Sequence, residues 1–323
     1  MKRGYYRAVA WGTGLCSFIA PVVSAVVFYS TGDPHHNTTA PTGELAGSGW
    51  ELQGDAFSGI PIAPNFFITA THVGGKVGGV FGFQGLEYPM IASFHHPDAD
   101  ITIWKVNGTF PQYAQLYRSS DEIGKPLVVF GRGTQRGNEI GMNGALKGWA
   151  WGTIDGLLRW GENVVAGISD EDGKPATSET KFQLLRADFD QNGGRNEAHL
   201  SGGDSGGGVF IRDGGVWKLA GVNHGADKEY SFTATGDEFM ATLFDEGGFF
   251  EGEEGKREYH PDDPSSPQPG SFHATRISAY IGWIESIIGS VNSTADIFLG
   301  EAPELFGPYT PAAGAIVASL TLL

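Results

Sequence analysis

A serine set among glycines is the side chain of this sequence best suited to chemistry. Ser205 lies within the run Gly202-Gly203-Asp204-Ser205-Gly206-Gly207. Glycines let the backbone turn sharply and point its N–H groups toward the hydroxyl, where negative charge develops during acyl transfer. A nucleophilic serine also needs a base to take its proton and a carboxylate to orient that base. The run therefore predicts a nucleophile whose partners must be sought elsewhere in the chain.

His72 and Asp100 are the candidates for these two partners. His72 follows an apolar run and closes the segment Thr69-Ala70-Thr71-His72, whereas Asp100 opens the apolar run 101–106 shortly after His96-Pro97. Asp98 is a weaker candidate because no apolar strand follows it directly. The histidine and the aspartate are thus each predicted at the end of a strand.

These segments together resemble the trypsin/chymotrypsin-like serine proteases, which carry such motifs in the order His, Asp, Ser. The resemblance covers roughly residues 49–289. It implies a serine endopeptidase with His72 as general base, Asp100 as its orienting carboxylate and Ser205 as nucleophile. It also implies an oxyanion hole formed by the N–H groups of Gly203 and Ser205, a protein or peptide substrate, and no cofactor or metal. A serine esterase with the same triad and an inactive binding protein of the same fold are the alternatives.

The pattern of short apolar runs and glycine-rich turns predicts an all-β protein. By resemblance, the fold is two antiparallel six-stranded β-barrels of the chymotrypsin type, at 49–122 and 123–289, the second ending in a helix. The helix is predicted from apolar residues at helical spacing, which are Ile277, Tyr280, Ile281, Ile284 and Ile288.

The N-terminus has the pattern of a secretory signal peptide over residues 1–25. Basic residues precede an apolar stretch, and Val23-Ser24-Ala25 offers small residues for cleavage. This predicts a secreted, periplasmic or cell-surface protein, with an uncleaved membrane anchor as the alternative. The one cysteine, Cys16, falls inside this segment, so the mature chain is predicted to lack disulfides, as in bacterial secreted members of the family.

Two further segments are predicted outside the barrels. Residues 26–48 are interpreted as a linker because most of them are polar, glycine or proline. Residues 290–323 are interpreted as a tail whose apolar end, 312–323, is too short for a membrane-spanning helix. That end resembles part of a bacterial surface-sorting signal, or is a buried or disordered terminus, so cell-surface association stays open.

The net charge of the chain limits the classes of partner that it can bind. The net charge is −16 and the isoelectric point is near 4.9, which argues against nucleic acid as a partner. The residue six before the nucleophile, often at the base of the specificity pocket in the family, is His199. Without an acidic residue there, a preference for Arg or Lys is not expected. His199 and His224 either favour acidic substrate side chains or are structural histidines.

Three features carry open alternatives. Asp204 pairs with a newly freed N-terminus in many family members, but no Ile-Val-Gly-Gly sequence precedes His72 here. The acidic segment 225–270 is predicted as a long surface loop, either a substrate-selecting lid or an inert insertion. Residues 188–193 match the start of a calcium loop, although a turn closed by Asx hydrogen bonds explains them more simply.

Overall fold

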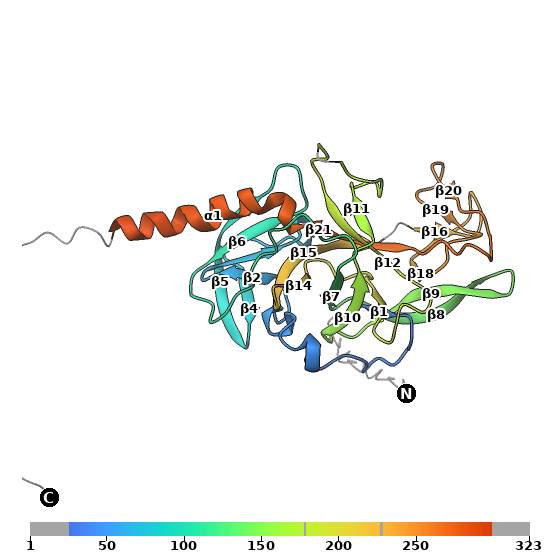
Figure 1. Ribbon diagram of the computed structural model, residues 1–323, viewed down its shortest axis with the longest axis horizontal. Helices are drawn as coiled ribbons and strands as arrows, with labels where there is room; N and C mark the ends of the chain where they lie inside the picture. The colour runs from blue at the N-terminus through green and yellow to red at the C-terminus, as the bar shows by residue number, and fades with distance from the viewer. Residues whose placement is uncertain (1–25, 178, 227–228, 299–323) are drawn as a thin grey trace, which may run out of the picture.

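The chain folds into two curled antiparallel β-sheets followed by a long helix. The computed structural model describes residues 26–298, apart from residue 178 and residues 227–228. Within this part, the α-helix α1 (Ile277–Phe298) projects from one side of a body built from strands (Figure 1). The predicted all-β class with two antiparallel sheets and a C-terminal helix is confirmed.

The first sheet contains five strands, one fewer than predicted. Its strands are apolar segments separated by turns, and each neighbouring pair is antiparallel. In order across the sheet they are β2 (Ile60–Ala63), β3 (Phe66–Thr69), β6 (Thr102–Val106), β5 (Leu86–His95) and β4 (Val80–Phe83). The aromatic rings of Phe67 and Phe81 stack 3.9 Å apart inside this sheet, which gives the first half of the molecule a core of its own.

The second sheet contains seven strands, one more than predicted. In order they are β10 (Arg159–Val164), β7 (Pro126–Gly131), β14 (Gly208–Asp213), β15 (Val216–Ala226), β21 (Ser271–Arg276), β12 (Leu184–Asp188) and β11 (Gly167–Ser169). The glycine-rich run of Ser205 lies directly before β14, so this sheet fixes the end of the predicted nucleophile loop.

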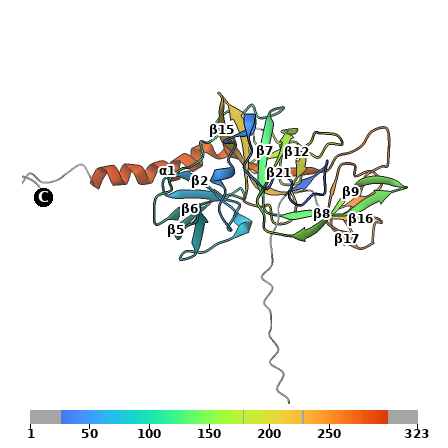
Figure 2. The same cartoon turned by 90° about the horizontal axis from the view of Figure 1, so that it is seen from below.

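One hydrophobic cluster joins the two sheets and α1. It contains Ile60 and Phe66 from the first sheet, Phe130 and Phe210 from the second, and Ile277 from the helix. Figure 2 shows α1 lying beside the first sheet on the left, with the second sheet to the right of both. The prediction of an amphipathic helix is confirmed, because the predicted positions are buried or half-buried against this cluster.

The prediction that residues 26–48 form a linker is wrong at its start. Val26 is buried, and β1 (Val27–Phe28) pairs with β13 (Ala198–His199) in a small antiparallel sheet. Two short 3₁₀-helices, η1 (Gly43–Leu45) and η2 (Trp50–Leu52), follow. Most residues after Phe28 are polar, so the short apolar start of the segment was overlooked. Val26 and Phe28 pack into the hydrophobic cluster of the second sheet.

The prediction that 225–270 is a surface loop is also wrong. This segment forms strands β16 (Tyr230–Ser231), β17 (Glu238–Phe239), β19 (Phe250–Glu251) and β20 (Glu258–Tyr259). It also provides β18 (Ala241–Leu243), which pairs with the long hairpin β8 (Thr134–Met142) and β9 (Ala145–Ile154).

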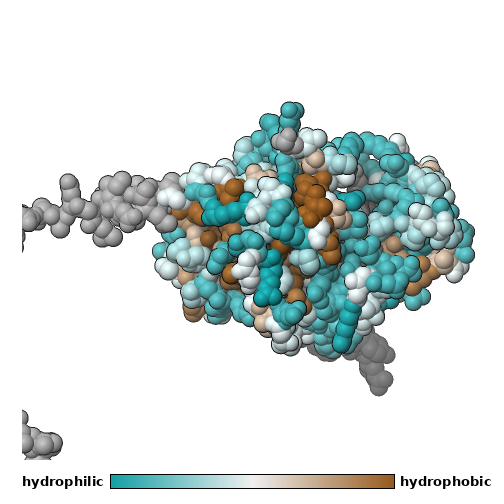
Figure 3. Space-filling model, in the orientation of Figure 1, coloured by the Kyte–Doolittle hydropathy of each residue, from teal (hydrophilic) through white to brown (hydrophobic). Residues whose placement is uncertain are grey.

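A small core explains why this acidic insertion is ordered. Tyr230, Leu243 and Phe249 are buried together, and Lys147 of β9 is buried in ion pairs with Asp245 and Asp262. The insertion lies at the end of the molecule opposite α1 (Figures 1 and 2). On the face drawn in Figure 3, it is largely hydrophilic, while hydrophobic side chains gather nearer the middle of the body.

The predicted signal peptide and the apolar C-terminal end fall outside the described residues. The C-terminal boundary shifts, because α1 continues to Phe298 instead of ending near residue 289. Of the helices that the structure describes, none combines the length and apolar character needed to cross a membrane.

Candidate active site

The pairing of β3 with β6 brings His72 to Asp100. Thr69 at the end of β3 faces Thr102 at the start of β6, so the residues just beyond these strand ends meet. His72 lies in a 3₁₀ turn, η3 (Thr71–Val73), immediately after β3. Its Nδ1 atom is 2.6 Å from Asp100 Oδ2, and its backbone N–H donates to Asp100 Oδ1 over 2.9 Å. These two contacts fix the histidine ring through its Nδ1 edge and leave Nε2 directed elsewhere.

Asp100 is held by more than the histidine. Its side chain is 12% exposed, and its backbone oxygen accepts a hydrogen bond from Thr275 Oγ1 over 3.2 Å. Asp98 instead pairs with Lys181 across 3.3 Å at the surface. The structure therefore places Asp100, and not Asp98, against His72.

The electrostatics of the pair favour an ionised aspartate. Burial alone would raise the pKa of Asp100, but hydrogen bonds from His224 and His72 outweigh burial and lower it well below its usual range. The hydrogen bond to Asp100 raises the pKa of His72, and burial only partly opposes this. An ionised Asp100 can thus stabilise a positive charge that develops on His72.

The Ser205 turn depends on glycine at two positions. Gly203 and Gly206 have φ angles of +99° and +79°, a region that L side chains rarely adopt. A Cβ atom at Gly206 would lie 2.5 Å from Thr69 Oγ1, so the residue after Ser205 packs directly on the end of β3. The half-buried Ser205 is thereby placed at the same strand end that carries His72.

Hydrogen bonds from β15 hold the turn from its other side. Gly206 donates to the Asn223 carbonyl over 2.9 Å, and Asn223 Nδ2 donates to the Asp204 carbonyl over 3.0 Å. Within the described residues, the N–H groups of Gly203 and Ser205 have no acceptor, whereas those of Asp204 and Gly206 do. Two backbone donors at the turn are thus available to an external oxygen.

Asp204 points away from the turn into the second core. It is 1% exposed, and its carboxylate accepts hydrogen bonds from the backbone N–H groups of Gly133 and Ser201 and from Ser201 Oγ, over 2.6, 2.8 and 3.0 Å. A Cβ atom at Gly131 would lie 2.0 Å from its Oδ1, so β7 approaches it through glycine. Burial raises the pKa of Asp204 to about 7.

The two histidines predicted to line a specificity pocket have other partners. His224 Nδ1 lies 2.8 Å from Asp100 Oδ2, and its ring meets the His72 ring edge to face with centroids 5.8 Å apart. His199 is 1% exposed, with its ring between Phe189 and Phe272. Their role in specificity stays a prediction. The contact of His224 with Asp100 had no signal in the sequence, because the two are 124 residues apart.

Two groups of potential metal ligands converge in the described part of the chain. They are His72 with Asp100 and His224, and Glu246 with Glu251 and His260. In each group, histidine nitrogens hydrogen-bond the carboxylates themselves. The 188–193 segment belongs to neither group, and a Gly193-to-Asp190 backbone bond of 3.2 Å closes it as a turn.

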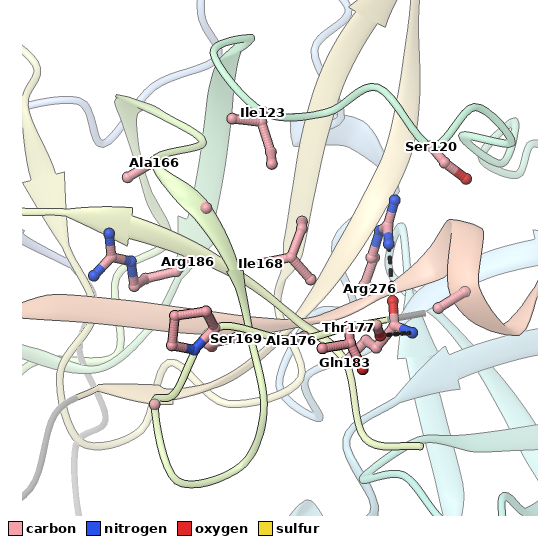
Figure 4. A pocket seen from close by; sticks show the side chains of 14 residues that line it. Ser120, Ile123, Ala166, Ile168, Ser169, Ala176, Thr177, Gln183, Arg186 and Arg276 are labelled. Carbon is pink, nitrogen blue, oxygen red and sulfur yellow. Dashed lines mark hydrogen bonds between the residues drawn. The ribbon is translucent and has the colours of Figure 1, made fainter. Parts of the chain in front are cut away.

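A large cavity lies away from these residues. It has a volume of about 820 Å³ and is lined by residues from the segment before β7, from the β11–β12 region and from the junction of β21 with α1, including Ile123, Ile168, Arg186 and Arg276. Figure 4 shows Arg276 directed at Gln183, to which it donates a 2.8 Å hydrogen bond. Arg276 is also paired with the buried Glu122. His72, Asp100 and Ser205 are not part of the lining, so this cavity is separate from the triad.

Comparison with known proteins gives a fold neighbour and no sequence relative. No protein-family model and no curated protein matches the chain. Among solved structures, neuropsin, a serine protease expressed in the limbic system of mouse brain, is similar with a TM-score of 0.44 and 17% identity. The match covers 76% of this chain and 97% of that one. At this similarity the comparison carries no argument about activity, which must come from the site itself.

Proposed function

We propose that the chain is a serine hydrolase that cleaves peptide bonds through an acyl-enzyme. The observation that carries the proposal is the pair of contacts between His72 and Asp100, at 2.6 and 2.9 Å, beside the turn that presents Ser205. A carboxylate bound to Nδ1 fixes the tautomer in which Nε2 accepts a proton. The turn of Ser205 supports the proposal further, because Gly206 packs on Thr69 at the end of β3, three residues before His72.

In the proposed reaction, Ser205 Oγ attacks the carbonyl carbon of the substrate while His72 Nε2 takes its proton. The negative charge on the carbonyl oxygen is stabilised by the N–H groups of Gly203 and Ser205. The carbon–nitrogen bond then breaks, and His72 returns the proton to the leaving amine. Water hydrolyses the acyl-enzyme by the same steps in reverse order, with His72 again acting as base. Ionised Asp100 stabilises the His72 imidazolium in both halves.

The proposed substrate is an extracellular protein or peptide. Support comes from the resemblance of the motifs to secreted endopeptidases and from the predicted signal peptide. The predicted pocket position holds His199, which offers no carboxylate to a substrate Arg or Lys. Cleavage restricted to those residues is therefore not expected.

A fluorophosphonate probe tests the nucleophile and a peptide library tests the substrate. The wild-type chain should be labelled at Ser205, and the Ser205→Ala chain should not. Digestion of the library should then yield defined cleavage sites. Labelling without any peptide cleavage would favour the esterase alternative, and absence of labelling in the mature protein would favour an inactive binding protein.

A further inference from the structure

The cavity beside β11 and β12, of about 820 Å³, has a lining whose charge is opposite to that of the chain. Of its 14 lining residues, Arg186 and Arg276 are basic and none is acidic, whereas the whole chain has 37 acidic and 21 basic residues. A concave site of this size, with an apolar wall and a few charged groups, is the usual form of a small-molecule site. The two arginines therefore decide which ligands the cavity can take.

Arg276 is already neutralised by its neighbours. Its Nε and Nη2 atoms donate to the two carboxylate oxygens of the buried Glu122 over 2.9 and 2.7 Å, and its Nη1 atom donates to Gln183 Oε1 over 2.8 Å. Two parallel hydrogen bonds to one carboxylate fix a guanidinium firmly. Arg276 thus forms part of the wall and has no charge left for a ligand.

Arg186 is held much more loosely. Its Nε atom lies 3.4 Å from Asp188 Oδ1, and its Nη2 atom lies 3.5 Å from Asp188 Oδ2, whereas a charge-assisted hydrogen bond measures about 2.7–2.9 Å. Over the part of the chain that the structure describes, its Nη1 atom has no acceptor. A Cβ atom at Gly167, another lining residue, would lie 3.7 Å from Arg186 Nε. The Arg186 guanidinium therefore lies against the lining strand and offers a cation that a ligand anion can bind.

The apolar part of the lining accompanies this cation. Ile168 of β11 is half-buried and packs in part on the hydrophobic cluster of the second sheet. In Figure 4 it is seen between Arg186 and Arg276. Ile123 is 63% exposed, and Pro175 is exposed as well. Because a ligand that covers such side chains removes apolar surface from water, the lining favours a ligand with an anionic end and an apolar body.

A peptide added as a further strand fits this place poorly. β11 is the edge strand of its sheet, but the segment that follows it already occupies its outer edge. The N–H of Ala176 donates to the Ile168 carbonyl over 2.9 Å, and the N–H of Asp170 donates to the Lys174 carbonyl over 2.8 Å. Strand addition needs a row of free backbone groups, which these contacts remove. The lining therefore favours a small molecule over a peptide.

We propose that this cavity binds a small aliphatic carboxylate. The carboxylate pairs with Arg186, and the hydrocarbon chain lies against Ile123 and Ile168. Binding is non-covalent, and the proposed hydrolysis uses none of these residues. The site is thus a second binding function of the chain, and it can be tested whether or not Ser205 is a nucleophile.

Calorimetric titration of the full chain with decanoate tests the site. Decanol keeps the hydrocarbon chain without the charge, so it should bind about 10- to 100-fold more weakly, the scale of a hydrogen bond to a charged group. Arg186→Gln should weaken decanoate binding by a similar factor and leave decanol binding unchanged. Arg212→Gln replaces an exposed arginine of β14 in the same sheet. It is the matched control and should change neither affinity.

A second variant tests the apolar wall. Ile123→Ser should weaken decanoate binding about 3- to 10-fold, because less apolar surface is covered. Since Ile123 is largely exposed, urea unfolding should show nearly unchanged stability. An unchanged affinity for decanoate would overturn the placement of the hydrocarbon chain.

Nuclear magnetic resonance of the arginine Nε–H groups locates the carboxylate. Decanoate should shift the signal of Arg186 and leave that of Arg276, which is bound to Glu122, nearly unchanged. Equal affinities for decanoate and decanol, or a decanoate affinity that Arg186→Gln does not alter, would overturn the pairing with Arg186. Equal weakening by Arg212→Gln would show a non-specific attraction and would overturn the site, as would the absence of measurable binding of either probe.

Discussion

The His224 ring donates its Nδ1 hydrogen bond to the same oxygen of Asp100 that contacts His72, at 2.8 Å. Two imidazoles from different sheets thus converge on one carboxylate oxygen. Because both stabilise the ionised form, the pKa of Asp100 lies well below its usual range even though burial acts in the opposite direction. His224 is therefore a positioning residue for the proposed triad.

Replacing His224 by Ala should lower kcat by about 3- to 30-fold with little change in KM, since one hydrogen bond to a charged group is lost. His224→Asn should restore part of the rate, because its side-chain amide can donate to Asp100. Steady-state kinetics on a peptide substrate provides the measurement. A rise in KM alone would instead support the predicted pocket role of His224.

Ser205→Ala and His72→Ala should each reduce kcat by at least about 10³-fold, because the two groups act as one unit. Asp100→Asn should cost a comparable factor by favouring the wrong histidine tautomer. Urea unfolding should show that Ser205→Ala leaves stability nearly unchanged. Wild-type turnover by Ser205→Ala would contradict the proposed nucleophile.

Hydrolysis should increase with pH as His72 loses its proton, with a midpoint above the ordinary 6.5 because Asp100 raises the His72 pKa. In Asp100→Asn the attraction is removed, so the remaining activity should show a lower midpoint. The kcat/KM profile between about pH 5 and pH 9 measures both. A profile that is flat in the wild type would exclude a histidine base when chemistry limits the rate.

The stability of the acidic insertion should depend on His260. The hydrogen bond to Glu251 raises the pKa of His260 to about 9, and Glu246 adds to this effect. Because the folded-state pKa exceeds that of the unfolded chain, the stabilisation is fully present below pH 6.5 and is lost as the pH rises through about 9.

His260→Gln should therefore lower the free energy of unfolding at pH 6 by about 1 to 3 kcal/mol and have a much smaller effect at pH 10. Urea unfolding at the two pH values checks this. His35→Gln, at an exposed position, is the matched control and should be neutral at both. An equal loss at pH 6 and pH 10 would show that His260 acts through packing and not through its charge.

The sequence was most informative where local pattern and chemistry coincide. The segments of His72, Asp100 and Ser205 each join a recognisable strand to a turn, and the helical spacing from Ile277 to Ile288 predicts α1. Strand number was less predictable, because β11, with three residues, is too short to carry a periodic pattern.

Long-range pairing was beyond the sequence. The apolar start Val26–Phe28 is too short to show a strand pattern, and its partner β13 is some 170 residues away. The composition of the segment therefore pointed to a linker. In the insertion, the buried Lys147 draws Asp245 and Asp262 out of solvent. These acidic residues look solvent-exposed in the sequence, but they stabilise the fold because a lysine distant in the chain pairs with them.

The hydrophobic cluster that joins Phe66, Phe130 and Ile277 has a consequence for how the molecule comes apart. His72 and Asp100 belong to one sheet and Ser205 and His224 to the other, yet both sheets bury side chains in this same cluster. Each half also has a core of its own, but unfolding of either half would expose the shared cluster to water, so we expect the two halves to melt in a single cooperative transition. The site would then be present in full or absent, with no partly folded form able to expose a working serine.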